Sequence, residues 1–229
     1  MTATAIVTGG SRGLGFAVAA DLARAGWHVI IDARNAEALR AAAAAIGARA
    51  VPGDIAEPAH RRALVEAASA TGRLDLLVNN ASTLGASPPP RLRYLGLEIV
   101  EHVYRVNVIA PLGLIQEGLP MLAASNGAVL NITSDAAVEA YEGWGGYGSS
   151  KAALELLSNV LAVEEPQLRV WWLDPGDMRT QMHQEAFPEE DVSDRPEPET
   201  VVPAVRALLE QRPASGRMLA TELLVGHRP

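Results

Sequence analysis

Tyr147 and Lys151 are the residues of this sequence whose types and spacing best suit acid–base chemistry. They stand at the start of a stretch with helical spacing, so both side chains lie on one helix face, about one turn apart. A free tyrosine has a pKa of about 10, and an ammonium within about 4–6 Å lowers it by about two to three units. The spacing therefore predicts a tyrosine that transfers protons near neutral pH. A surface lysine beside a half-buried ring would explain the same spacing without chemistry.

Two further polar residues lie where they can join this pair. Ser134 ends the strand-like run VLNITS, thirteen residues before Tyr147. A serine at a strand end can also simply satisfy its own backbone. Asn107 lies in the apolar run RVNVIAP, where an amide is costly to bury unless it is hydrogen-bonded.

A glycine cluster, Thr8–Gly15, joins a strand-like run to the first helical stretch. Gly9 permits a tight turn, Gly13 permits a pyrophosphate to approach the backbone, and Gly15 lets the helix pack close to the sheet. The helix N-terminus adds unpaired N–H groups and a partial positive charge. The cluster therefore predicts a dinucleotide site in preference to a turn that merely needs glycine.

Short β-rich apolar runs alternate with longer stretches of helical spacing along the chain. The expected strands are Ala3–Thr8, His28–Asp32, Arg49–Val51, Leu74–Asn79, Ala128–Thr133, Val170–Leu173 and Met218–Val225. The expected helices are Gly13–Ala25, Ala36–Ile46, His60–Thr71, Leu97–Ala110 continuing toward Ala123, Tyr147–Glu164 and Glu199–Glu210. This alternation predicts an α/β fold, a Rossmann-type, doubly wound and mostly parallel seven-stranded sheet with helices on both faces. We expect a single domain over residues 1–229.

Two segments do not fit the alternation. Ser82–Arg93 contains three consecutive prolines and is expected to be a loop beside the end of the fourth strand. Arg179–Thr200 is acidic and interrupted by prolines, which is typical of a solvated loop or of a lid. Both interpretations stay open, and we expect residues of about 179–200 to form a substrate loop.

The composition argues against several classes of protein. The 229 residues carry a formal net charge of −8, which disfavours nucleic-acid binding. The chain has no cysteine, and its five histidines lack metal-ligand spacing, so no metal site is expected. We see no segment of membrane-spanning length and no signal peptide at the start, so we expect a cytoplasmic protein with no membrane partner.

The glycine cluster TGxxxGxG, the YxxxK pair, Ser134 and Asn107 together resemble the short-chain dehydrogenase/reductase family, and further family markers extend the resemblance over about residues 3–225. The resemblance implies a catalytic tetrad of Asn107, Ser134, Tyr147 and Lys151. In that arrangement Ser134 orients the substrate carbonyl and Tyr147 donates a proton. Lys151 lowers the pKa of the tyrosine and binds the nicotinamide ribose. Asn107 kinks the long helix and holds a water linked to the lysine.

The family resemblance also implies which residues contact the cofactor. Asp54, in VPGDI, is expected near the adenine, and PGxxxT near the nicotinamide; Ser82 replaces the glycine of the usual NNAG. The expected cofactor-binding residues are Gly9, Ser11, Arg12, Gly13, Leu14, Gly15, Arg34, Asn35, Asp54, Ile55, Asn80, Ala81, Tyr147, Lys151, Pro175, Gly176, Met178 and Thr180.

The end of the second strand bears on the choice between NADP and NAD. In the family's register Ala33 takes the position of the NAD-selecting carboxylate and Arg34 the phosphate-binding position, with Arg12 as a second basic residue. A guanidinium fork suits a 2′-phosphate, so we predict NADP (NADPH). A shift of one residue would instead make Asp32 select NAD, and both arginines would also suit a solvated surface.

The second half of the chain is most similar to the sepiapterin-reductase branch, in the runs GWGGY, EEP and PGDMRTQMHQ. The aspartate by which that branch grips a pterin has no counterpart, because Ala220 follows Leu219 and Glu222 is out of step. We therefore expect NADPH-dependent reduction of another ketone, aldehyde or diketone to an alcohol. An NAD-dependent alcohol dehydrogenase of the same family and a non-catalytic dinucleotide-sensing regulator are the alternatives.

The candidate substrate-pocket residues are Asp135, Trp144, Met178, Met182 and Phe187. Trp144 could instead pack across a dimer interface, and methionines often fill a core. The acidic loop should disfavour an anionic substrate, although salt screens exposed carboxylates. Relatives usually pair through the two long helices, which implies a homodimer or homotetramer.

Overall fold

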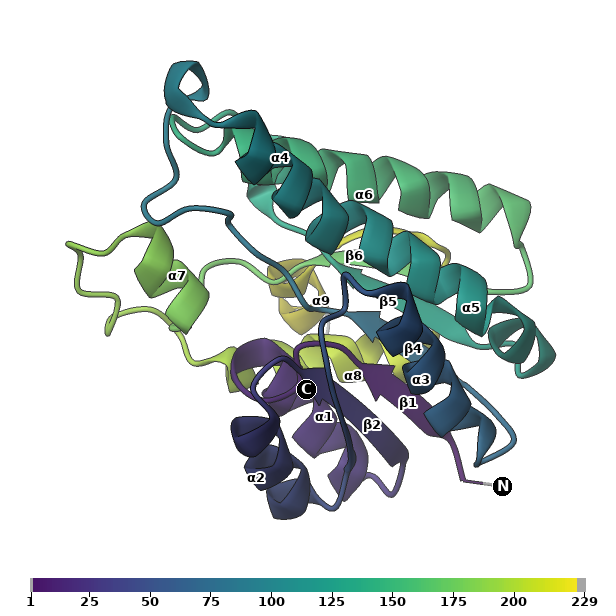
Figure 1. The fold of residues 1–229 in the computed structure, drawn as a ribbon. Coiled ribbons are helices and arrows are strands. Elements are labelled where there is room, and N and C mark those ends of the chain that lie inside the picture. The colour runs from purple at the N-terminus through teal and green to yellow at the C-terminus, as the bar shows by residue number, and fades with distance from the viewer. Residues whose placement is uncertain (1, 226–229) are drawn as a thin grey trace.

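The computed structural model describes residues 2–225, which form one parallel sheet between two layers of helices (Figure 1). The strands are β1 (Thr4–Val7), β2 (His28–Ala33), β3 (Arg49–Pro52), β4 (Leu76–Asn79), β5 (Ala128–Ile132), β6 (Arg169–Asp174) and β7 (Gly216–Leu219). Their order across the sheet is β3-β2-β1-β4-β5-β6-β7, and each neighbouring pair is parallel. The predicted doubly wound, seven-stranded α/β fold is confirmed, and the described sheet is wholly parallel.

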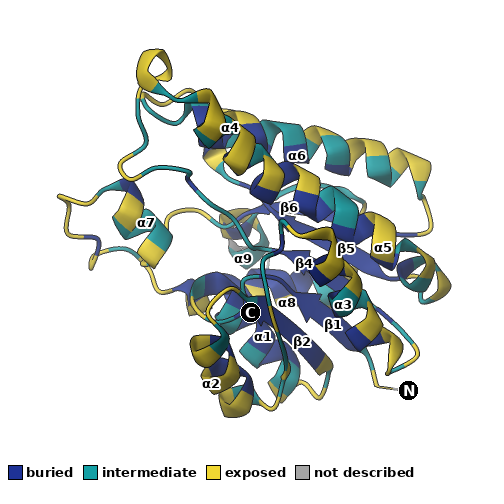
Figure 2. Cartoon of the chain, in the orientation of Figure 1, coloured by how far each residue is buried: buried dark blue, intermediate teal, exposed yellow. Residues whose placement is uncertain are grey.

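Helices cover both faces of the sheet, so the strands are buried from both sides. One layer contains α1 (Gly13–Arg24), α2 (Ala36–Ile46) and α8 (Val202–Gln211), and the other contains α3 (Pro58–Ser69), α4 (Leu97–Tyr104), α5 (Ala110–Ala124) and α6 (Gly145–Glu164) (Figure 1). Side chains alternate along each strand, so Val7 packs on the first layer and Ile6 on the second. The strands are accordingly apolar and mostly buried, dark blue in Figure 2.

A π-helical turn, Arg105–Ile109, joins α4 to α5, so one helical rod runs over Leu97–Ala124. Such turns are rare and occur often at functional sites. The expectation that no segment reaches membrane-spanning length is wrong, because this rod is long and apolar enough by length and composition. Half of its most apolar stretch is buried inside the protein, as in a helix that packs on a sheet.

The prediction for the C-terminal end is wrong in part. The last strand is β7, and residues 220–225 form the helix α9 (Ala220–Val225) instead of extending the strand. Alanine, glutamate and leucine are strong helix formers. The partly buried Leu223 and Leu224 also pack against the core, where α9 contacts α8.

The acidic segment Arg179–Thr200 contains a short helix, α7 (Gln181–Ala186), that the composition did not predict. The hydroxyl oxygen of Thr180 accepts a hydrogen bond from the backbone N–H of His183 and so caps its first turn. The first part of this segment, as far as Phe187, lies beside the carboxyl ends of the strands, and most of the residues after it are exposed.

The strand order reverses between β1 and β4, and ligands of open α/β sheets bind at such a switch point. The glycine cluster follows β1, Asn80 follows β4, Ser134 comes shortly after β5 and Pro175 follows β6. All four therefore meet at one edge of the sheet. A cleft of about 1080 Å³ lies there.

Candidate active site

Three of the four tetrad side chains line this cleft. Tyr147 and Lys151 lie on the first turns of α6, and Ser134 lies just past β5. Lys151 is 2% exposed, and its Nζ donates to the carbonyl oxygen of Ile132 at 2.8 Å and lies 5.5 Å from the centre of the Tyr147 ring. A spacing of four residues on a helix places the two side chains on the same face, as predicted.

Burial changes the two pKa values in opposite directions. It raises the pKa of Tyr147 well above its ordinary value, and the neighbouring hydroxyls of Ser134 and Ser82 offset only part of the rise. Burial lowers the pKa of Lys151 to about 8. The predicted lowering of the tyrosine pKa is therefore wrong for these surroundings, because loss of water around the phenolate outweighs the hydrogen bonds that favour it. At neutral pH Tyr147 holds its proton and Lys151 keeps most of its charge.

Asn107 lies inside the π-helical turn and is 1% exposed. Its Nδ2 donates to Thr83 O at 2.9 Å and to Ser150 Oγ at 3.0 Å, and its Oδ1 accepts from Thr83 N at 2.9 Å and Ser82 Oγ at 3.1 Å. Ser82, which replaces the usual glycine, thus binds the tetrad asparagine directly. These four bonds use the full capacity of an amide. A relay water of the kind implied by the resemblance would have to be held by main-chain groups of the turn.

The hydroxyl of Ser134 is hydrogen-bonded to its neighbour in the sequence. Its Oγ donates to Asp135 Oδ1 at 2.9 Å and accepts from the backbone N–H of Ala136 at 3.2 Å. The other carboxylate oxygen of Asp135 accepts from the Tyr141 hydroxyl at 2.9 Å. Asp135 was expected to line the substrate pocket; its contact with Ser134 was not foreseen.

The glycine cluster fits a close-packed phosphate loop. Gly9 adopts a φ of +67°, and a Cβ built on Gly15 would lie 2.5 Å from Gly9 O, so a larger residue at Gly15 would displace the turn. Asn80 Nδ2 donates to Thr8 O at 2.8 Å and so fixes the turn against β4. Gly13 begins α1 and lines the cleft, where the free N–H groups of the helix can meet phosphates.

A buried contact between Asp32 and His60 beneath this loop had no signal in the sequence. Asp32 is 2% exposed; its Oδ1 accepts from Gly9 N at 2.7 Å and its Oδ2 lies 2.9 Å from His60 Nε2. The carboxylate therefore supports the glycine loop from below and is held by two partners. The sequence spacing of Asp32 and His60 carries no signal for this contact, which depends on α3 packing beside β2.

The expected cofactor-binding residues all line the cleft except Gly15, which packs behind the loop. Arg34 is exposed just past β2, and Arg12 donates to Gln181 Oε1 of α7. The side chain of Asn35 caps α2, and Asp54 Oδ1 accepts from Ala56 N at 2.9 Å. The charged side chains of Arg12, Arg34 and Asp54 at one end of the cleft, and the glycine cluster in its middle, fit a nicotinamide dinucleotide.

The expected substrate residues gather at the other end of the cleft. Trp144 lies 5.6 Å from the Tyr147 ring and 5.8 Å from the Phe187 ring, measured between ring centres. Met182 packs in the same small cluster, and Met178 lines the cleft but packs on the main core. The acidic segment thus contributes side chains to the wall of the site. Its sequence position alone did not show which of them would face inward.

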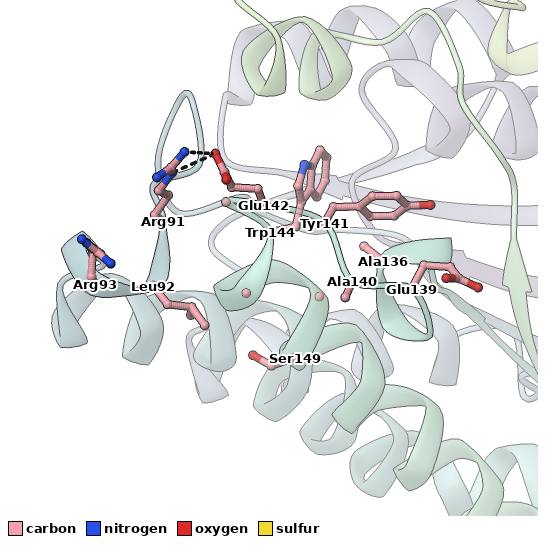
Figure 3. A pocket seen from close by; sticks show the side chains of 13 residues that line it. Arg91, Leu92, Arg93, Ala136, Glu139, Ala140, Tyr141, Glu142, Trp144 and Ser149 are labelled. Atoms are coloured by element: carbon pink, nitrogen blue, oxygen red, sulfur yellow. Dashed lines mark hydrogen bonds and ion pairs between the residues drawn. The ribbon is translucent and has the colours of Figure 1, made fainter.

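A shallower hollow of about 420 Å³ adjoins this end of the cleft (Figure 3). Tyr141 and Trp144 line both the hollow and the cleft. On its outer side Arg91 Nε donates to Glu142 Oε1 at 2.8 Å, the pair joined by dashed lines in Figure 3. Trp144 therefore lies at the boundary between the two spaces.

A charged group behind the tetrad was also not foreseen. Arg217 of β7 donates through Nε to Glu155 Oε1 at 3.0 Å and through Nη2 to Asp174 Oδ2 at 3.0 Å. The same Nη2 lies 3.3 Å from the Ser134 carbonyl oxygen. Arg217 thus connects β7, β6 and α6 with Ser134, two residues past β5.

Comparison with known proteins gives concordant matches. A family model described as short chain dehydrogenase matches residues 3–191. A rhamnolipid-biosynthesis 3-oxoacyl-[acyl-carrier-protein] reductase of Pseudomonas aeruginosa is 41% identical over 171 residues, which are 70% of this chain and 66% of that protein. Sepiapterin reductase of Mus musculus is 34% identical over 200 residues, which are 80% of this chain and 77% of that protein. The match thus spans just under two thirds of the first relative.

Solved structures share the fold over nearly the whole chain. A short chain dehydrogenase from Shigella flexneri, complexed with NADP, has a TM-score of 0.89 and 30% identity, and the match covers 96% of this chain and 97% of that one. An alcohol dehydrogenase from the archaeon Thermococcus sibiricus, complexed with 5-hydroxy-NADP, has a TM-score of 0.86 and 26% identity, with 96% of each chain covered.

Proposed function

The chain belongs to the short-chain dehydrogenase family of oxidoreductases, and we propose that it uses NADPH to reduce a ketone, aldehyde or diketone to an alcohol. One observation carries the proposal: Tyr147, Lys151 and Ser134 meet beside a glycine-lined cradle at the same edge of the sheet. Tyr147 and Lys151 are held together by α6, and Ser134 lies two residues past the end of β5.

In the proposed reaction this chain's residues hold the carbonyl and supply the proton. The reduced nicotinamide, when bound, supplies the hydride that the carbonyl carbon accepts. The Ser134 hydroxyl donates to the carbonyl oxygen and orients it toward Tyr147, whose phenol donates the proton. The raised pKa of Tyr147 keeps that proton in place until the oxygen becomes basic. Lys151 is held at Ile132 O, and its remaining N–H donors would bind the nicotinamide ribose while its charge would stabilise the phenolate after transfer.

The preference for NADPH rests on the two arginines and on the position of Asp32. Arg34 is exposed at the ribose end, and its planar guanidinium suits a 2′-phosphate. Asp32 is already held by Gly9 N and His60, so it is a poor acceptor for a ribose hydroxyl. Arg12 supports the same choice once its bond to Gln181 is exchanged for a phosphate oxygen.

The proposed oligomer is a homodimer or homotetramer that pairs through the helices bearing Asn107 and Tyr147. Apolar side chains are exposed on these helices: Leu97, Ile109, Leu156, Val160 and Val163. An isologous contact between two copies would remove them from water. Sedimentation of the purified chain would test this, and a monomer at micromolar concentration would contradict it.

The test of the function is a fluorescence titration with NADPH and NADH, followed by turnover of a panel of diketones, quinones, aldehydes and sepiapterin. We expect tight NADPH binding and reduction of at least one ketone or aldehyde. Tyr147→Phe should abolish turnover while NADPH binding is largely kept, and Tyr94→Phe, at an exposed tyrosine outside the cleft, is the matched control. Retained turnover in Tyr147→Phe refutes the mechanism. Binding of NADPH without turnover of any carbonyl favours a dinucleotide sensor.

A further inference from the structure

The hydroxyl of Ser134 has one proton, and in this structure it is donated to Asp135 Oδ1. The same proton is the one that must be donated to the substrate carbonyl. A bond to a carboxylate is roughly twice as strong as a bond to a neutral acceptor. A simple ketone therefore competes poorly for Ser134, and the site needs a way to release this hydroxyl when the substrate binds.

A substrate donor that binds Asp135 Oδ1 has to take the place of Ser134. Oδ1 accepts from Ser134 Oγ and from Ala136 N at 2.8 Å, which uses both of its acceptor positions, and Oδ2 accepts from Tyr141 OH at 2.9 Å. The side chain is exposed at the cleft, and within the described part of the chain it forms no ion pair with a cationic side chain. The hydrogen bond to Asp135 raises the pKa of Tyr141, because the bond holds the phenol proton in place.

We propose that the substrate brings its own donor: an O–H or N–H group on the carbon next to the carbonyl, which binds Asp135 and frees Ser134 for the carbonyl oxygen. The inference rests on the proposed reduction and narrows its substrate class to α-hydroxy and α-amino ketones or aldehydes. Asp135 is then a specificity-determining residue that touches the substrate, and Ser134 reaches its productive orientation only when that donor is in place.

The geometry suits such a substrate because the Ser134 hydroxyl, which needs an acceptor, and the Asp135 carboxylate, which needs a donor, are adjacent. Ser134 Oγ and Asp135 Oδ1 lie 2.9 Å apart, and the carbonyl oxygen and α-substituent of one ketone are only three bonds apart. One small molecule can therefore meet both side chains at once. A 2-oxo acid places a carboxylate at the α-position instead, where Asp135 repels it.

The test compares ketones that differ only in the donor. α-Hydroxyacetophenone and α-methoxyacetophenone have similar carbonyl reactivity, but only the first can donate a hydrogen bond from its α-substituent. If another ketone of the panel is turned over faster, the α-hydroxy and α-methoxy derivatives of that ketone are compared instead. We expect kcat/KM to favour the hydroxy ketone about tenfold or more, the range of a hydrogen bond to a charged group. In Asp135→Ala the preference should fall below about threefold, and in the isosteric Asp135→Asn it should lie between.

Glu139→Gln is the matched control, because it removes the same charge four residues further on without a hydrogen bond to Ser134. It should keep the full preference for the hydroxy ketone. A preference near one in the unmodified protein, or one unaltered in Asp135→Ala, overturns the inference while Tyr147-dependent turnover leaves the proposed function standing. If Asp135→Ala does not fold, the ratio of kcat/KM for the hydroxy and methoxy ketones in Asp135→Asn decides between these outcomes. Absence of turnover of every carbonyl with NADPH bound rejects both proposals.

Discussion

Lys151 offers the sharpest physical prediction, because it is the only lysine in the sequence and is almost completely buried. Burial lowers its pKa from the ordinary 10.5 to about 8. The buried ammonium therefore lowers the free energy of unfolding at neutral pH. Replacing the lysine with methionine keeps a similar length and removes the charge. We predict that Lys151→Met makes the protein more stable and inactive.

The magnitude follows from the two pKa values. The difference between 10.5 and about 8 corresponds to about 3 kcal/mol of destabilisation at pH 7, since each pKa unit is about 1.4 kcal/mol. Methionine leaves the Ile132 carbonyl without the Nζ donor, which costs about 1 kcal/mol. The expected net gain of Lys151→Met at pH 7 is thus about 2 kcal/mol in the free energy of unfolding.

The pH dependence gives this prediction its sign. Between about pH 8 and 10.5 the unfolded chain binds the proton that the folded lysine has lost, so the unmodified protein gains stability as pH rises. The advantage of Lys151→Met should therefore shrink by about 2 kcal/mol between pH 7 and pH 9.5. Urea unfolding of the two proteins without cofactor at both pH values measures this difference.

A direct reading of the pKa is also available, because a single lysine gives a single side-chain NMR signal after labelling at Cε. Its titration should have a midpoint of about 8 in the folded protein. A midpoint above 10, or an advantage of Lys151→Met that does not depend on pH, would refute the reasoning from burial. In that case water reaches Nζ, and the surroundings of Lys151 are more polar than its burial indicates.

Three other outcomes follow from the site. The kcat/KM for reduction should fall as pH rises through about 8, because Lys151 loses its charge there; a flat profile to pH 10 contradicts this role. Arg34→Ala should weaken NADPH binding about tenfold or more with little effect on NADH, whereas Arg40→Ala, exposed on α2, should change neither; equal losses for both cofactors would argue against a phosphate contact. Arg217→Met should lower the free energy of unfolding by about 2 kcal/mol, since it leaves Glu155 without its cation, and adding Glu155→Gln should recover part of the loss; additive losses in the double variant would contradict the pairing.

The parts of the fold that follow from local pattern were predictable from the sequence. Alternating apolar runs and helical stretches define βαβ units, and the handedness and order of a doubly wound sheet then bring the carboxyl ends of its strands to one edge. The glycine cluster before α1 and the four-residue spacing of Tyr147 and Lys151 are local as well. The local sequence therefore predicts both the cofactor-binding turn and the catalytic pair.

The parts that depend on contacts between distant segments were not predictable. The pair of Asp32 with His60 forms because α3 packs beside β2, and no spacing in the sequence indicates it. The strand expected at the C-terminus becomes α9 because Leu223 packs on the core. The pKa of Tyr147 was expected to fall because the sequence indicates the neighbouring charge of Lys151. The loss of water around the phenol depends on packing, which the sequence does not indicate.

The opposite pKa changes of Tyr147 and Lys151 have one cause, and that cause favours one direction of chemistry. Low access to water destabilises the phenolate of Tyr147 and the ammonium of Lys151. Tyr147 therefore keeps its proton at neutral pH, and Lys151 loses its proton more easily than a lysine in water does. Reduction begins from a protonated tyrosine, which is the resting state of this site. Oxidation of an alcohol has to begin from the phenolate, which burial makes scarce at neutral pH. An enzyme cannot move the overall equilibrium, but in the proposed reduction the proton donor of this site is already protonated when each cycle begins.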